Sequence, residues 1–165
     1  MPDPFQNVDA AGPEFIKYFA DTMDRRQEDP AMEAIVADYL GRLTFGPNTL
    51  TVEVGCGAGA VSRRIATRAA PGVLRGYDPS AGFVAEARVR AADHANASFE
   101  QANGADLPLG DGVADHLILH TVLTHVAAPA PVGIEAARVL KPGGTLVICD
   151  GDFSKATLES FPNDP

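Results

Sequence analysis

Three glycines at alternate positions follow an apolar run near the middle of the sequence. Thr51–Val54 leads into Gly55-Cys56-Gly57-Ala58-Gly59. Glycine adopts positive φ and has no Cβ, so a turn of this kind lets a ligand approach the main chain. A predicted helix begins at Val61, and its first free N–H groups face the same place. The pattern indicates a ligand-binding turn between a strand and a helix; a turn that only connects them is the alternative.

An acidic residue ends the next predicted strand. Asp78 follows the segment Val73–Tyr77, about 20 residues beyond the glycine turn. This separation is typical of a carboxylate that accepts hydrogen bonds from both hydroxyls of a ribose. The alternative is that Asp78, Pro79 and Ser80 only cap the following helix. Because the acid and the glycine turn stand at adjacent strand ends, the sequence favours ribose binding.

Polar residues also follow the third and fourth predicted strands. Asn103 and Gly104 come after the third, where an amide side chain and bare backbone can bind an adenine edge. A simple connecting loop is the alternative. His120 and Thr121 end the fourth strand, and we expect them to open into the same crevice as Asp78.

A single parallel sheet would bring these strand ends together. Helical periodicity begins at Phe15, and a second helix begins at Asp29-Pro30. We predict strands at 49–54, 73–78, 97–101, 115–120 and 145–149, with helices at 58–70, 80–92 and 131–140. The fold class is therefore α/β, a Rossmann-like doubly wound and mainly parallel sheet of about five strands, order 3-2-1-4-5, with two leading helices.

Composition limits the classes of function. The 165 residues are 45% hydrophobic, enough for one domain with a sizeable core, and carry a net charge of −9. An acidic chain without a Lys/Arg cluster is not expected to bind nucleic acid. Cys56 and Cys149 lack metal-ligand spacing, so free thiols and a cytoplasmic location are expected. No apolar run approaches ~20 residues, so we expect no membrane segment.

From about 31 to 150 the sequence resembles the class I S-adenosylmethionine-dependent methyltransferases, particularly the small-molecule branch that includes ubiquinone and menaquinone C-methyltransferases. The segments that carry the resemblance are Val52–Gly59, Asp78, Leu107–Asp115 and Val139–Gly144. The first is similar to the family's glycine turn, which holds the methionine part of the cofactor, and Asp78 corresponds to its ribose-binding acid. The resemblance implies S-adenosyl-L-methionine as cofactor and a small-molecule methyl acceptor.

The same resemblance implies a set of site residues. The cofactor-binding candidates are Glu53, Gly55, Gly57, Asp78, Pro79, Asn103, Gly104, His120 and Thr121. Glu53 is expected to order the turn through water or backbone, and a satisfied strand-end acid is its alternative role. His120 is the catalytic candidate, as a general base for an acceptor that carries a proton. No metal is expected.

Two features depart from the family pattern. Asn103 stands where the family often has an aspartate, which makes this contact with adenine neutral. The family usually continues well beyond the fifth strand, whereas this sequence ends at Pro165. We therefore expect either a truncated chain or a partner, a second copy or a completing subunit, that covers the fifth strand. The expected divisions are a helical lid region at 1–45, the cofactor-binding domain at 46–152 and a tail at 153–165.

Two other functions share part of this pattern. A NAD(P)-binding oxidoreductase domain has a similar turn and acid, but expects G-x-G-x-x-G, and here Ala60 and Val61 follow Gly59. A non-catalytic cofactor-binding subunit that completes another chain would explain the short carboxyl-terminal part.

Overall fold

Three short elements precede the sheet. The computed structural model of the chain describes residues 4–152. The first elements are η1 (Pro4–Ala11), α1 (Pro13–Gln27) and α2 (Pro30–Gly41). A proline opens both α-helices, and the Asp29 carboxylate caps α2 by accepting a hydrogen bond from the Ala31 amide at 2.8 Å. The two predicted leading helices are confirmed, whereas η1 was not predicted.

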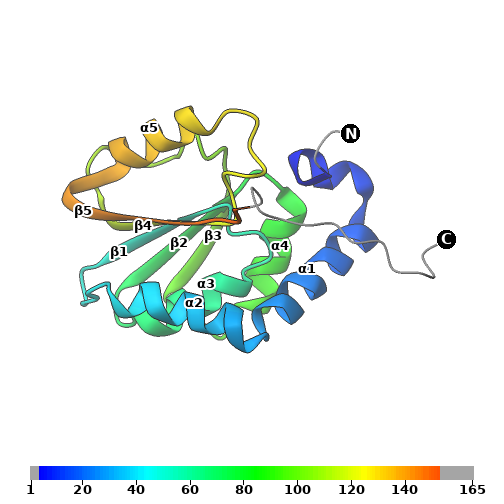
Figure 1. Ribbon diagram of the computed structural model, residues 1–165, viewed down its shortest axis with the longest axis horizontal. Helices are drawn as coiled ribbons and strands as arrows, with labels where there is room; N and C mark the ends of the chain where they lie inside the picture. The colour runs from blue at the N-terminus through cyan, green and yellow to red at the C-terminus, as the bar shows by residue number, and fades with distance from the viewer. Residues whose placement is uncertain (1–3, 153–165) are drawn as a thin grey trace.

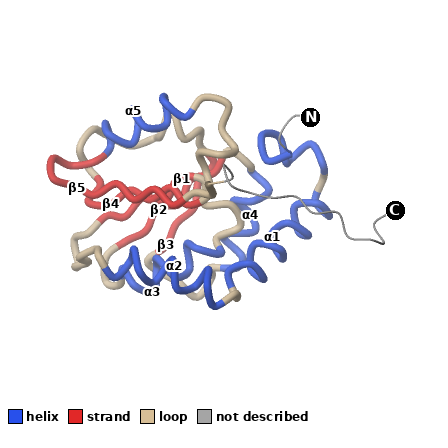
Figure 2. The backbone as a smooth tube through the Cα atoms, in the orientation of Figure 1, coloured by secondary structure: helices blue, strands red, loops and turns tan. Residues whose placement is uncertain are grey.

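The remaining elements alternate between strand and helix, except that β4 follows β3 with no helix between them. In chain order they are β1 (Leu50–Val54), α3 (Ala60–Ala69), β2 (Val73–Asp78), α4 (Ala81–Arg90), β3 (Ala97–Gln101), β4 (Ala114–His120), α5 (Pro129–Val139) and β5 (Leu140–Cys149). All neighbouring strands are parallel, and the sheet order is β3-β2-β1-β4-β5 (Figure 2). The predicted doubly wound sheet and its order are confirmed.

Helices cover both faces of this sheet. Figure 1 shows α5 over one face and α2, α3 and α4 against the other. Successive side chains of β4 point to opposite faces of the sheet, so β4 contributes to the apolar core on each face. Leu117 and Leu119 pack with Val132 of α5, while Ile118 packs with Ile65 of α3. The carboxyl ends of the strands lie at one edge of the molecule, on the side of α1.

Ion pairs hold α1 in place beside α3 and α4. The Arg90 guanidinium of α4 contacts Asp21 at 2.7 Å and Asp24 at 2.6 Å, and Arg63 of α3 also contacts Asp24, at 2.5 Å. These arginines are mostly shielded from solvent, so the pairs are less screened than ordinary surface pairs. The C-terminal half of α1 is therefore tied to the sheet-covering layer.

The fifth strand begins earlier than predicted. We predicted a helix that ends at 140 and a strand at 145–149, but β5 starts at Leu140. Leu140 pairs with Ala114, and Thr145 already pairs with His116, so β5 carries extra residues at this point. Such an insertion is a bulge in the ladder, and Gly143 accommodates it with a φ of +83°. The glycines are therefore inside the strand pairing instead of before it.

β5 is also an edge of the sheet in the part of the chain that the structure describes. Leu146 is 39% exposed and Ile148 is 53% exposed, unlike the buried side chains of β1 and β4. Apolar side chains on an open edge are normally covered or paired. Separately, no helix within residues 4–152 is long and apolar enough to cross a membrane.

Candidate functional site

The glycine turn is held by the end of the neighbouring strand. The amides of Gly55 and Cys56 both donate to the Tyr77 carbonyl of β2, at 2.7 and 3.0 Å. Gly55, Gly57 and Gly59 have φ values of +72°, +51° and +82°, which L side chains rarely adopt. The turn therefore depends on glycine for its conformation.

Asp78 lies beside this turn and joins it to the next helix. One carboxylate oxygen accepts from the Gly57 amide at 2.9 Å, and the other accepts from the Ser80 amide at 2.9 Å. Burial raises the pKa of Asp78 to about 6, although these two hydrogen bonds oppose the rise. Each carboxylate oxygen can accept a further hydrogen bond. With a pKa of about 6, the group is mainly ionised at neutral pH and keeps the capacity to accept further hydrogen bonds.

Glu53 is a hydrogen-bonded acid near the end of β1. It is fully enclosed at the end of β1, and the Ser62 hydroxyl of α3 donates to its Oε2. Burial raises the pKa of Glu53 to about 8, despite this hydrogen bond. Its Ser62 contact connects the end of β1 to α3, behind the turn.

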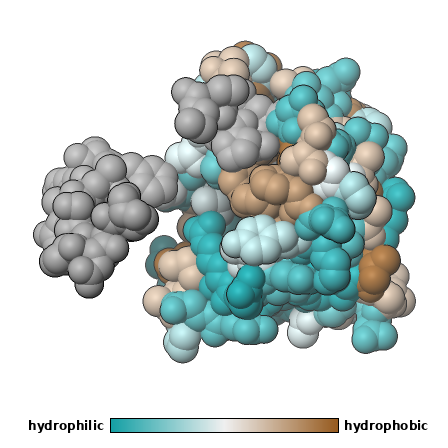
Figure 3. All heavy atoms as spheres, turned by 90° about the vertical axis from the view of Figure 1, so that its right-hand side faces the viewer, coloured by the Kyte–Doolittle hydropathy of each residue, from teal (hydrophilic) through white to brown (hydrophobic). Residues whose placement is uncertain are grey.

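The N-terminal segment lies over the turn. Met23 of α1 packs so closely that a Cβ on Gly57 would meet its sulfur at 3.0 Å, and Ala58 belongs to the same apolar cluster as Val8 of η1. Asp9 of η1 accepts hydrogen bonds at the start of α4, from Ser80 Oγ at 2.6 Å and from the Ala81 amide at 2.9 Å. Figure 3 views this side of the molecule and shows apolar surface in the middle of polar side chains.

Asn103 and Gly104 form a tight loop after β3. The Asn103 side-chain oxygen accepts from the Ala105 amide at 2.9 Å, a local turn contact that leaves one lone pair. A Cβ on Gly104 would lie 2.7 Å from Val54, so this loop packs directly on the end of β1. Pro79, another candidate, is exposed, and its carbonyl accepts from Gln101 at 2.8 Å.

His120 and Thr121 lie at the end of β4, as predicted. Nδ1 of His120 is 3.3 Å from the Tyr39 hydroxyl of α2. Burial and, next, the Arg26 charge lower the pKa of His120, while Asp150 opposes them. Thr121 adopts a φ of +56°, and its amide donates to the Cys149 carbonyl at 2.7 Å. This end of the site is therefore built from α2, β4 and β5.

The other histidines lie elsewhere. Nε2 of His116 is 2.9 Å from the Thr44 carbonyl, and Nε2 of His94 is 3.1 Å from the Thr67 hydroxyl. The His125 ring packs on Phe5, with centroids 4.7 Å apart. Both cysteines are free thiols, and no metal-holding group of His, Cys, Asp or Glu occurs within residues 4–152.

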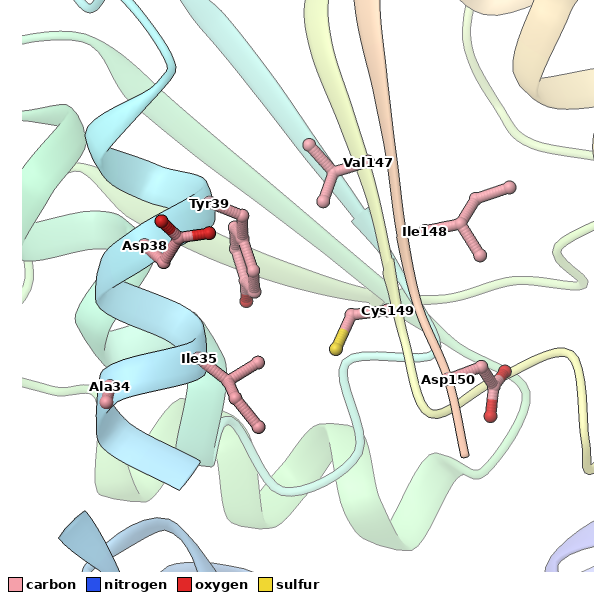
Figure 4. A pocket seen from close by; sticks show the side chains of 8 residues that line it. All are labelled: Ala34, Ile35, Asp38, Tyr39, Val147, Ile148, Cys149 and Asp150. Carbon is pink, nitrogen blue, oxygen red and sulfur yellow. The ribbon is translucent and has the colours of Figure 1, made fainter. Parts of the chain in front are cut away.

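An open groove of about 620 Å³ lies beside His120 and not over the glycine turn. Figure 4 shows α2 side chains on one wall and the end of β5 on the other. Its lining residues are Ala34, Ile35, Asp38, Tyr39, Val147, Ile148, Cys149 and Asp150. The glycine turn is covered by η1 and α1. Open space at the carboxyl ends of the strands is therefore found beside β5, in the groove.

Three contacts of this site were missed in the sequence. Asp9 belongs to a segment without helical periodicity, and Tyr39 reads as a core residue on the buried face of α2. Val122 packs against Gly55, where an added Cβ would meet its Cγ2 at 2.5 Å. Of these three residues, only Asp9 has a residue type that hints at its contact, because acidic residues are favoured at helix N-termini.

The chain matches known proteins over most of its length. A family model described as a methyltransferase domain matches residues 52–148, more than half of the chain. A demethylmenaquinone methyltransferase of Tropheryma whipplei is 36% identical over 119 residues, covering 72% of this chain and 48% of that protein. The chain spans about half the length of the curated relatives it matches.

Solved structures share the fold. A SAM-dependent methyltransferase from Aquifex aeolicus matches with a TM-score of 0.72 and 19% identity, covering 92% of this chain and 79% of that one. A methyltransferase in complex with the Haloferax volcanii Trm112 methyltransferase activator matches with a TM-score of 0.68 and 31% identity. That match covers 82% of this chain and 59% of the other. From the family model and the Tropheryma relative, we conclude that the chain belongs to the class I S-adenosylmethionine-dependent methyltransferases.

Proposed function

We propose that the chain binds S-adenosyl-L-methionine and transfers its methyl group to a small-molecule acceptor. One observation carries the proposal: Asp78 is held by two backbone amides beside a turn whose glycines have positive φ. This arrangement leaves carboxylate oxygens and bare backbone at adjacent strand ends, where ligands bind in open α/β sheets. The residues present therefore fit a ribose attached to a second group that needs close access to the main chain.

Each part of the cofactor has residues suited to it. Asp78 would hold the ribose hydroxyls, and the backbone at Gly55 and Gly57 would hold the methionine end. Asn103 and Gly104 would hold the adenine edge through the amide and the main chain, with Pro79 beside them. Glu53 supports this site from behind through Ser62. When bound, the cofactor supplies a methyl group that is already activated on a sulfonium.

The chain's own contribution is chiefly positioning. The glycine turn on the β1 and β2 side lies under α1 and η1, while His120 and Thr121 lie at the open side with the groove. We place the acceptor at this open side. A small-molecule acceptor is favoured because the Tropheryma relative is named for methylation of demethylmenaquinone.

A partner at the fifth strand is part of the proposal. The exposed Leu146 and Ile148 lie on the edge strand beside the groove. The structural relative in complex with a methyltransferase activator supports a second polypeptide as a component of such enzymes. We propose that a second copy or a completing subunit covers this edge. We also keep residues 1–45 as a lid, residues 46–152 as the cofactor domain and a cytoplasmic location, in which the free thiols persist.

Calorimetric titration tests the function directly. We expect S-adenosylhomocysteine to bind and NAD to show no heat of binding at the same concentrations. Binding of NAD alone would overturn the proposal in favour of an oxidoreductase domain. Turnover with radiolabelled S-adenosylmethionine and candidate quinone-type and carboxylate acceptors then separates a catalyst from a non-catalytic binding subunit.

A further inference from the structure

Tyr39 and His120 meet between α2 and the end of β4. The Tyr39 oxygen lies 3.3 Å from Nδ1 of His120, and the ring centroids are 6.0 Å apart. Tyr39 is 9% exposed and forms part of the groove wall, near Cys149 (Figure 4). The pair thus links the groove to the strand end where we place the acceptor.

The direction of this hydrogen bond determines what His120 can do. Within residues 4–152, Nδ1 of His120 is the one hydrogen-bond partner of the Tyr39 hydroxyl. Tyr39 is largely buried, and leaving its hydroxyl proton unpaired would cost about 1–3 kcal/mol, which favours donation by the phenol to Nδ1. Burial, followed by the charges of Glu53, Cys149 and Glu33, raises the pKa of Tyr39, so the phenol keeps its proton.

An imidazole that accepts at Nδ1 carries its proton on Nε2 when it is neutral. Three elements present groups that act on this ring: Arg26 of α1, Tyr39 of α2 and Asp150 at the end of β5. Burial and Arg26 favour the neutral form over the opposing charge of Asp150. In the described part of the chain, Nε2 has no hydrogen-bond partner, so it is left for a ligand.

We propose that Tyr39 is a positioning residue that fixes His120 as the tautomer with its proton on Nε2. His120 then donates a hydrogen bond to the bound reactants and does not take a proton from them. This replaces the general-base role expected for His120. The inference rests on the proposed function for what is bound, but the tautomer is a property of the protein alone.

The proposal narrows the class of acceptor. A site that presents an Nε2–H donor, with the Arg26 charge nearby, suits an acceptor whose reacting group already carries negative charge, such as a carboxylate or an enolate. Such an acceptor does not depend on His120 to remove a proton. A neutral alcohol or amine would lack a base at this position.

Nitrogen NMR of the protein labelled with ¹⁵N-histidine tests the tautomer. The His120 signals are identified by their loss in His120→Gln. We expect Nδ1 to resonate as an unprotonated nitrogen and Nε2 as a protonated one near pH 7.5. In Tyr39→Phe, both tautomers become populated, and the imidazole pKa rises by about half a unit to one unit because the donor that stabilised the neutral ring is gone.

Tyr18→Phe is the matched control. Tyr18 is an exposed tyrosine of α1 that packs on Phe19, so its loss leaves the His120 signals unchanged. A proton on Nδ1 in the unsubstituted protein overturns the proposal, and this spectrum decides it even if Tyr39→Phe does not fold. An unchanged tautomer and pKa in folded Tyr39→Phe also overturns it. Failure of S-adenosylhomocysteine to bind, with the tautomer as expected, contradicts the proposed function and leaves the tautomer standing.

Discussion

The carboxyl ends of β1 and β2 differ in structure from the carboxyl ends of β4 and β5. At β1 and β2, short backbone contacts close the glycine turn on Tyr77 and Asp78, and η1 and α1 lie over it. At β4 and β5, the same edge opens into a groove with exposed apolar side chains. The first half of this edge, at β1 and β2, is closed by contacts within the protein, several of them between elements far apart in the sequence. The second half brings together α2, β4 and β5 and leaves Leu146 and Ile148 exposed.

The closed half contains the group whose titration should affect stability most. Burial raises the pKa of Glu53 to about 8, from 4.5 in an ordinary environment. Between these values the folded chain binds more protons than the unfolded chain, so the free energy of unfolding falls as pH rises from about 4.5 to about 8. One proton gives a slope of up to about 1.4 kcal/mol per pH unit.

Urea unfolding across this pH range, for the natural chain and Glu53→Gln, measures the effect. The variant keeps the side-chain volume and a hydrogen-bond acceptor for Ser62 but cannot titrate, so its profile should be flatter. A smaller contribution of the same sign from Asp78 ends near pH 6. Parallel profiles for the two proteins would show that Glu53 is not a buried acid with a raised pKa.

The second-largest effect concerns ligand affinity in the same half. Asp78→Ala removes charge-assisted hydrogen bonds to the ribose and should weaken S-adenosylhomocysteine binding roughly tenfold to a hundredfold. The matched variant is Asp38→Ala, because Asp38 lines the groove. If the two halves have separate roles, its affinity for this ligand stays unchanged. Equal losses in both variants would break the comparison.

The contact between η1 and the start of α4 should contribute less. Asp9→Ala removes hydrogen bonds to Ser80 Oγ and to the amides of Ala81 and Gly82 at the start of α4. Loss of a helix cap costs about 0.5–2 kcal/mol of unfolding free energy, which denaturant titration resolves. Asp9→Asn keeps an acceptor oxygen and should recover most of the loss. An unchanged unfolding midpoint in Asp9→Ala would mean that the cap is not formed in solution.

The smallest effect on stability belongs to the open half. Ile148→Lys changes an exposed edge side chain and should alter the free energy of unfolding by no more than about 0.5 kcal/mol. The buried neighbour Ile118 is the contrast, since Ile118→Ala should cost about 2–5 kcal/mol. Light scattering at micromolar concentration should show less self-association in Ile148→Lys if a second copy covers this edge. Persistent association would point to a different surface.

Local sequence patterns were enough to predict most of the fold. β2 and β3 have the predicted bounds, and the sheet order follows from alternating strands and helices with a switch after β3. The error at β5 has a physical cause. Pro142, Gly143 and Gly144 are turn-forming residues, yet the pairing of Ala114 with Leu140 holds them in a bulge. A tertiary contact overrode the local preference.

The candidate site also combines residues that local sequence patterns reveal with contacts that depend on the tertiary structure. Gly57 and Asp78 were found because the turn requires glycine and the acid follows at a fixed distance. The partners of Asp9 and His120 could not be found, since each contact joins residues more than seventy positions apart. Asn103 was selected only because it follows the third strand. The hydrogen bond that its side-chain oxygen accepts from the Ala105 amide depends on the local turn.

The Asp78 carboxylate links two turns through the protein's own amides, at Gly57 and at Ser80. Exchange of these amide hydrogens with deuterium requires a local opening that breaks the link. A ligand that binds only the closed arrangement reduces the population of open molecules by the factor 1 + [L]/Kd. At a ligand concentration of about 100 times Kd, exchange at both amides should slow by about a hundredfold and to the same degree. Two amides on different turns would thus report occupancy of one site, independently of any turnover.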